Sequence, residues 1–156
     1  MEFSVLKRDV KTVERRRHIL LGPDNKQSHL KLFRYQVTEE KLREVRSLLS
    51  HRDCGIKRIT VHHVTFNDKK AKLLAKGISL NDTINEVEII KCKIKVNQME
   101  LLTRAIGTNE SIETLLFENT SVLERHGFAL GQALSQNVSL KHLTLIGCGI
   151  GDLAMI

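Results

Sequence analysis

Three glycines in the segment Gly147-Cys148-Gly149-Ile150-Gly151 have the composition of a phosphate-binding loop. They follow Leu143 and Leu145, whose alternation is typical of a strand. A dinucleotide site needs the spacing G-x-G-x-x-G, and its third glycine opens a helix within a βαβ unit. Position 152 is instead Asp, and the sequence stops at Ile156 before a helix could form. We therefore expect these glycines to shape a turn and not to bind a nucleotide.

Histidine and cysteine side chains are the other candidates for metal binding or nucleophilic catalysis. His62 and His63 are adjacent on an expected strand, so their side chains should point in different directions. Cys54 has no evident histidine and carboxylate partners, and the motifs G-x-S-x-G, H-E-x-x-H and C-x-x-C are absent. These observations predict no metal site, no cofactor and no enzymatic activity.

The elements that would position any site follow from an apolar pattern that recurs every 28 residues. In its first clear copy the pattern reads Ile-x-x-Ile-x-Val-x-x-Val-x-Phe. A fixed period of this length is typical of stacked supersecondary units, each packed on its neighbours. The four copies begin at Ile56, Ile84, Ile112 and Leu140. A fainter copy, one 29-residue step upstream, places in register Leu30, Leu32, Tyr35 and Val37.

This pattern resembles the leucine-rich repeat, L-x-x-L-x-L-x-x-N/C-x-L followed by a helix, and its 28-residue period is similar to that of the ribonuclease-inhibitor-like class. The resemblance covers residues 28–156. It implies an α/β fold, a leucine-rich repeat solenoid of about five repeats with a concave parallel β-sheet and convex helices. The last repeat is truncated, so we expect a fragment or isoform of a longer chain, and the alternative is that a partner covers the open edge of the last strand. The superfamily includes inhibitors, GTPase activators, actin-capping proteins and sensor domains, so the resemblance implies binding and no particular activity.

A polar residue recurs just after each predicted helix. We interpret it as the residue that takes the left-handed conformation at the helix end, which Asn tolerates well. The positions are Asp53, Asn81, Asn109 and Asn137. The three asparagines also begin N-glycosylation sequons. Because the turn explains them and no secretory signal is present, we expect no glycosylation there.

Two of the three cysteines, Cys92 and Cys148, occupy the same position two repeats apart. Neighbouring parallel strands lie about 4.8 Å apart, so these residues should be roughly 10 Å apart, beyond disulfide reach. We expect buried thiols in a reducing compartment. No apolar run can span a bilayer, and the N-terminus lacks an apolar signal region. The expected location is cytoplasmic, and neither a nuclear nor a cytoskeletal placement is excluded.

Positive charge is concentrated in the first half of the chain. Residues 1–78 contain 19 Lys and Arg against 9 Asp and Glu, whereas residues 79–156 contain 6 against 9. This gradient suggests an acidic partner, although a solvated surface explains it equally well. Residues 1–27 lie outside the repeat and have basic, amphipathic helical spacing. We predict a helical cap on the first repeat, and the alternative is a helix that binds acidic lipid or nucleic acid.

Strand residues that do not enter the core should line the concave face, and those that are apolar there indicate a protein contact. Basic residues beside them would suit carboxylates or phosphates. The candidate partner-binding residues are Phe33, Arg34, Arg58, His62, His63, Ile90, Lys91, Leu116 and Ile146.

The sequence therefore predicts a non-enzymatic scaffold that binds another protein, one with an acidic stretch, on its concave sheet. Two alternatives remain open at this point. The basic half of the chain, with Arg15, Arg16 and Arg17, could bind nucleic acid or another acidic polymer, although no aromatic platform supports sequence-specific binding. The chain could also regulate a GTPase or other enzyme by binding to it.

Overall fold

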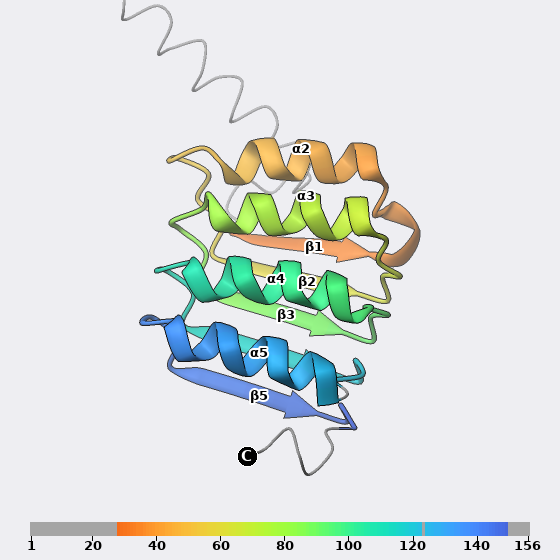
Figure 1. Cartoon of the computed structure of the whole chain (residues 1–156). Coiled ribbons are helices and arrows are strands. Elements are labelled where there is room, and N and C mark those ends of the chain that lie inside the picture. Colours follow the sequence, from red (N-terminus) through yellow and green to blue (C-terminus); the bar gives the residue numbers. More distant parts are fainter. Residues whose placement is uncertain (1–27, 123, 150–156) are drawn as a thin grey trace, which may run out of the picture.

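The computed structural model describes residues 28–122 and 124–149, in which strands and helices alternate along the chain (Figure 1). The predicted cap over residues 1–27 and the last glycine of the cluster, Gly151, lie outside the described residues. The strands are β1 (His29–Phe33), β2 (Arg58–His62), β3 (Glu86–Ile90), β4 (Thr114–Glu118) and β5 (His142–Ile146). A short 3-10 helix, η1 (Arg34–Gln36), follows β1. The α-helices are α2 (Glu39–Leu49), α3 (Asp68–Ser79), α4 (Val96–Thr108) and α5 (Glu124–Gln136).

The strands form one parallel sheet in the order β1-β2-β3-β4-β5, which is also their order in the sequence. Each residue of β2 pairs with the residue 28 positions later, as Ile59 does with Val87, and β3 and β4 continue this register. The step from β1 to β2 is 29 residues, as in the pair Leu30 and Ile59. The predicted α/β class, the parallel sheet and the strand register are confirmed.

The helices form a second layer over one face of the sheet (Figure 1). Alternate strand residues point into the space between the layers, so that β3 and β4 show the same in-and-out burial pattern. Helix residues at spacings of three and four meet them, such as Met99, Leu102 and Ile106 of α4, all at most 1% exposed. The core is therefore aliphatic apart from Phe66 and Phe117.

The helix starts are fixed by local side-chain hydrogen bonds. The side-chain oxygens of Thr38 and Asn67 accept from the main-chain N–H groups of Lys41 and Lys70, at 3.1 and 2.8 Å. These bonds satisfy N–H groups that have no partner within the helix. At α4 the arrangement is reversed, because Lys95 N–H donates to the side-chain oxygen of Gln98 at 3.0 Å. The helices α2 to α5 begin at the end of the sheet where the strands finish (Figure 1).

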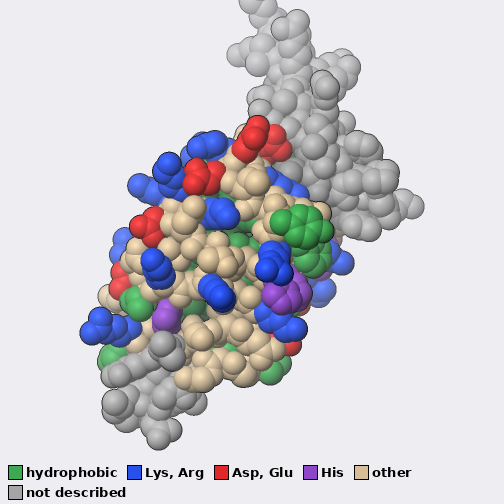
Figure 2. Space-filling model, turned by 90° about the vertical axis from the view of Figure 1, so that its right-hand side faces the viewer, with side chains coloured by type: hydrophobic (Ala, Val, Ile, Leu, Met, Phe, Trp, Pro, Cys, Tyr) green, Lys and Arg blue, Asp and Glu red, His purple; other side chains and the backbone are tan. Residues whose placement is uncertain are grey.

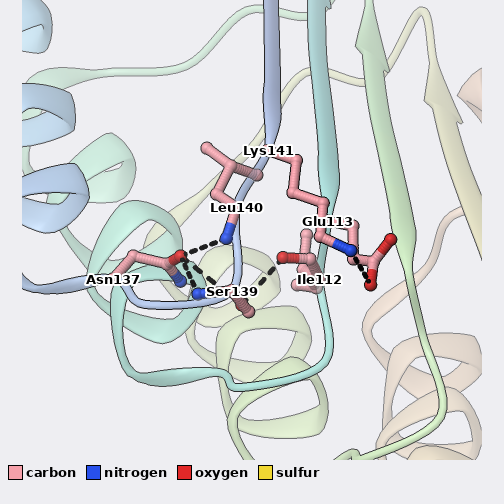
Figure 3. A network of polar contacts seen from close by, with 6 residues as sticks. All are labelled: Ile112, Glu113, Asn137, Ser139, Leu140 and Lys141. Atoms are coloured by element: carbon pink, nitrogen blue, oxygen red, sulfur yellow. Dashed lines mark hydrogen bonds and ion pairs between the residues drawn. The ribbon is translucent and has the colours of Figure 1, made fainter.

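The recurring asparagine has a different role from the one predicted. Figure 3 shows Asn137 bonded within its own turn, where its Oδ1 accepts from the N–H groups of Ser139 (2.9 Å) and Leu140 (2.6 Å). Its Nδ2 donates to main-chain carbonyls of the preceding unit, those of Ile106 (2.9 Å) and Asn109 (3.0 Å). The asparagine therefore joins neighbouring units through its side chain.

The prediction that these asparagines take a left-handed backbone is wrong. Asn109 lies in the extended region, with φ −76° and ψ 134°. Like Asn137, it donates from its side-chain amide to two main-chain carbonyls of the preceding unit, those of Ile78 and Asn81. The side chains of Asn81 and Asn109 are buried. The left-handed residues come instead directly after the strands, where φ is 55° at His63, 51° at Lys91 and 47° at Asn119. The turns after β2, β3 and β4 require the unusual conformation, and among the described residues between a helix and the next strand only Gly55 adopts it, with φ of 66°.

Tyr35 also departs from the predicted register. The equivalent residue one step later, Val64, is 1% exposed, but Tyr35 is 82% exposed. The η1 turn replaces the extended segment that follows the other strands, so the side chain at this position leaves the core. Val37 regains the expected burial at 2%.

The expected buried thiols are confirmed at Cys92 and Cys148, and Cys54 is buried as well. The thiols of Cys92 and Cys148 each lie against main-chain carbonyls, those of Ile90 (3.3 Å) and Phe117 (3.3 Å) respectively. Burial raises the pKa of the Cys92 thiol to about 11. Within the described part of the chain, no helix is both long enough and apolar enough to cross a membrane.

Candidate functional site

The candidate site is the face of the sheet that the helices leave uncovered, here called the sheet face. It is built from the first, third and fifth residue of each strand, because these side chains point away from the helices. The register aligns them in rows, one residue per strand. The third residues form the row Lys31, Thr60, Glu88, Leu116 and Thr144, and the fifth form the row Phe33, His62, Ile90, Glu118 and Ile146.

The apolar candidates on the sheet face do not form one continuous patch. Ile90 and Leu116 are half-buried and lie on neighbouring strands, two positions apart, within reach of each other. Phe33 (41% exposed) is separated from Ile90 by His62, and Ile146 (50% exposed) is separated from it by Glu118. The apolar centre of the sheet face is therefore the pair Ile90 and Leu116.

Polar side chains on the sheet face pair with their neighbours one strand away. Arg58 Nε donates to Glu86 Oε2 at 2.6 Å, and just outside the strands Lys141 Nζ lies 2.8 Å from Glu113 Oε1. Figure 3 shows the latter pair beside the asparagine turn. Arg58 was predicted to belong to a free basic rim, but its charge is already matched by Glu86.

A hydrogen-bonded chain of three side chains crosses β1, β2 and β3. The Thr60 hydroxyl donates to Glu88 Oε2 at 2.5 Å and lies 2.6 Å from His29 Nε2. Because the hydroxyl proton is directed to Glu88, His29 must donate from Nε2. Burial, followed by Lys31 and Arg58, lowers the pKa of His29, which agrees with a neutral ring. Sequence reasoning missed this chain, although Thr60 and Glu88 share the row of third residues and His29 is in the neighbouring row of first residues.

His62 and His63 do not point in different directions, so that prediction is wrong. Their Nδ1 atoms lie 3.0 Å apart and their ring centroids 4.4 Å apart. Strand alternation ends at His62, and the left-handed backbone of His63 turns its ring back toward its neighbour. Partial loss of hydration beside its neighbours, then the charges of His62, Lys91 and Arg34, lower the pKa of His63. His62 also meets Phe33 edge-on, with centroids 5.6 Å apart.

The paired imidazoles have no further ligand near them. In the described ranges, no group of three or more His, Cys, Asp or Glu side chains is arranged to hold a metal ion. The Nδ1 contact instead requires one ring to donate and the other to accept, which fixes the two rings relative to each other.

The glycine cluster has a backbone role in its described part. Gly147 and Gly149 have φ of 60° and 62°, the left-handed region that favours glycine. A Cβ at Gly147 would also collide with the side chain of Asn119, whose Oδ1 would lie 2.4 Å away. These two residues therefore shape the turn after β5.

Basic side chains gather at the end of the molecule where the strands finish. Arg34, His63 and Lys91 occupy the position after their strands and are exposed. Figure 2 faces this end and shows Lys and Arg side chains distributed over it, with His side chains among them. Strands β1, β2 and β3 thus place these three residues, here called the basic rim, beside the apolar centre of the sheet face.

Comparison of the chain with protein-family models and with curated proteins found no match to either.

Proposed function

We propose that this chain is a non-enzymatic protein-interaction module of the ribonuclease-inhibitor-like leucine-rich repeat type. The constant 28-residue register from β2 to β5 supports this, because stacked repeats of one length produce such a register. The asparagine that bonds to the preceding unit at Asn81, Asn109 and Asn137 supports it further. An extended surface made of equivalent positions is suited to binding another protein.

The partner, in this proposal, binds on the sheet face with Ile90 and Leu116 at the centre of the contact. The observation that carries the proposal is that the register places these two aliphatic residues diagonally on the neighbouring strands β3 and β4, on the side of the sheet away from the helices. Buried apolar centres ringed by polar groups contribute most of the binding energy of protein interfaces. Phe33 and Ile146 would extend the contact toward the two edges of the sheet.

In this proposal the basic rim of Arg34, His63 and Lys91 orients an acidic stretch of that partner, with Arg34 and Lys91 supplying the positive charge, because the pKa of His63 is lowered. No carboxylate is paired with Arg34 or Lys91 among the ion pairs of the described residues. Charges at the edge of an interface mainly raise the association rate and make it sensitive to salt. The rim would therefore steer the partner and the apolar centre would retain it.

The test is capture of partners from cell extract by the full chain and by the double variant Ile90→Asp and Leu116→Asp. We expect the variant to lose a partner that the unchanged chain retains at both low and high salt. The matched control is Leu80→Asp with Val138→Asp, because these aliphatic residues are 50% and 86% exposed at the helix-to-strand turns. Unchanged capture by the first variant, with circular dichroism showing an intact fold, would refute the assignment to the sheet face.

A second measurement separates protein from nucleic acid as the captured molecule. A photo-crosslinking residue in place of Glu118, on the sheet face, should label a polypeptide, whereas one in place of Gln132, on the exposed side of α5, should not. Material that is lost at higher salt and destroyed by nuclease would favour the nucleic-acid alternative instead.

A further inference from the structure

The helix layer contains a groove between α2 and α3 that is lined almost entirely by cations. Its volume is about 490 Å³. No acidic side chain lines it, and the single apolar lining residue is Leu73. The cationic lining residues, here called the basic groove, are Arg43 and Arg46 from α2 and Lys69, Lys72 and Lys76 from α3.

The cations of the basic groove form two rows that follow the helix axes. Lys69, Lys72 and Lys76 are spaced by three and four residues, and Arg43 and Arg46 by three, so each row occupies one face of its helix. With a rise of 1.5 Å per residue, the lysine row extends about 10 Å. α2 and α3 lie side by side (Figure 1), so the two rows face each other across the groove.

Most of this charge is not neutralised within the protein. Glu39 lies 3.8 Å from Arg43 and 3.9 Å from Lys69, and both of these ion pairs are exposed. Arg46, Lys72 and Lys76 take part in none of the ion pairs formed by the described residues. Cations held close together repel one another, so an anionic ligand would relieve that repulsion.

The floor of the basic groove is apolar and closely packed. Leu73 is partly buried and packs against the hydrophobic core. Near the far end, a Cβ on Gly77 would lie only 3.1 Å from Leu49 Cδ1 and 3.2 Å from Arg46 Cα, so the two helices are in close contact there. The aliphatic stems of the lysine and arginine side chains add to the apolar surface.

We propose that the basic groove binds an acidic amphipathic helix of a partner protein. Carboxylates on such a helix, spaced by three and four residues, would match the lysine row, and an apolar residue between them would contact Leu73. A nucleic acid fits less well, because no aromatic side chain lines the groove for base stacking and its floor is apolar. This site is on the opposite layer from the sheet face and stands independently of it.

The segments 1–27 and 150–156 are poor occupants of the basic groove on grounds of charge. Residues 1–27 contain seven Lys and Arg against four Asp and Glu, and residues 150–156 contain one acidic side chain, Asp152. Neither segment has the closely spaced carboxylates that the two rows of cations would recognise. The charge complementarity therefore excludes both of these segments and is consistent with the acidic helix proposed above.

The test is binding of the full-length protein to a synthetic helical peptide of about four turns with glutamates at positions i, i+3 and i+7 and leucines between them. Fluorescence anisotropy would measure its affinity. We expect Lys72→Glu with Lys76→Glu to weaken binding about tenfold or more, because two attractive charges become repulsive. Lys57→Glu with Lys93→Glu is the matched control, with the same change of charge at exposed positions outside the groove, and should weaken binding no more than about twofold.

Three results would overturn the proposal. The first is equal weakening by both charge-reversal pairs, and the second is equal affinity for a peptide with glutamines in place of the glutamates. The third is tighter binding, at the same salt concentration, of a single-stranded oligonucleotide that Lys72→Glu with Lys76→Glu abolishes. Lys72→Gln with Lys76→Gln provides a milder variant if the reversed pair does not fold, and it too should weaken peptide binding.

Discussion

The side chain of Asn109 donates a 2.8 Å hydrogen bond to the main-chain carbonyl of Asn81, the residue that occupies the same position one unit earlier. Asn109 also donates to Ile78 and accepts from the N–H groups of Ser111 and Ile112. One buried amide thus satisfies four main-chain groups from two units. Without it, the Ile78 carbonyl would keep its bond from Asn81 N–H, but the Asn81 carbonyl and the N–H groups of Ser111 and Ile112 would lose the partner that Asn109 supplies.

Asn109→Ala should therefore destabilise the protein by about 2–4 kcal/mol, the cost of leaving several buried polar groups without partners. Urea denaturation followed by circular dichroism measures this change in the free energy of unfolding. Asn85→Ala is the control, since Asn85 is exposed and the change should stay within about 0.5 kcal/mol of the parent. Equal effects at the two positions would contradict the proposed role of Asn109.

Two helix glycines should respond in opposite directions to alanine. A Cβ on Gly107 of α4 would lie 2.9 Å from the carbonyl oxygen of Ala133 in α5, so Gly107→Ala should force the helices apart and destabilise the protein. A Cβ on Gly131 would meet nothing within 4 Å. Gly131→Ala should then raise stability by about 0.5–1 kcal/mol through helix propensity. Thermal denaturation of both variants measures the direction of each change in stability. A change in the same direction for both variants would contradict the packing argument.

Cys92 should make stability fall at alkaline pH. The thiol pKa is about 11 in the folded chain against an ordinary 9.0, so the folded state keeps its proton to higher pH than the unfolded state. Its contribution is complete below pH 9 and is lost as the pH rises toward 11, with a slope of at most about 1.4 kcal/mol per pH unit. Denaturation at several pH values, compared with Cys92→Val, isolates this contribution. Parallel pH profiles for the two proteins would contradict it.

Asp68 should titrate at lower pH than an ordinary aspartate. Hydrogen bonds from Gln98 and Asn97, both 3.0 Å from its Oδ1, lower its pKa below 3.8. Its contribution to stability is present above the unfolded pKa and is lost as the pH falls through the lower folded value. Carbon-13 NMR titration should show the carboxyl pKa rising in Gln98→Ala. Replacement of Glu100 by Ala, on the same helix, should leave it unchanged.

The fold was largely predictable because one apolar pattern repeats with a constant period. Periodicity located the strands and their 28-residue register, and the alternation within them identified core residues such as Val87 and Ile89. Tyr35 was misassigned because the η1 turn replaces an extended segment, and apolar pattern alone does not distinguish the two. The asparagines were placed at the right positions for the wrong reason, because their function depends on contacts with another unit.

The candidate site was predictable only in outline. The rows on the sheet face followed from the register, but the pairing of Arg58 with Glu86 depends on side-chain geometry. Strand alternation failed for His63 because a left-handed residue ends it. The net charge of each half of the chain does not reveal the basic groove, because the groove depends on which helix faces carry the cations. The spacing of Lys69, Lys72 and Lys76 in the sequence was a usable signal, since it places them on one helix face.

Because the strands lie in the sheet in the order of the sequence, residues paired in register on neighbouring strands are always 28 or 29 positions apart. The loop that must close to pair two strands therefore keeps the same length wherever it forms, and the entropy lost in closing it does not grow along the sheet. Removing or duplicating one 28-residue unit would leave every other pairing at its original separation. Chain length can thus change in steps of one unit without altering the bonds inside those that remain.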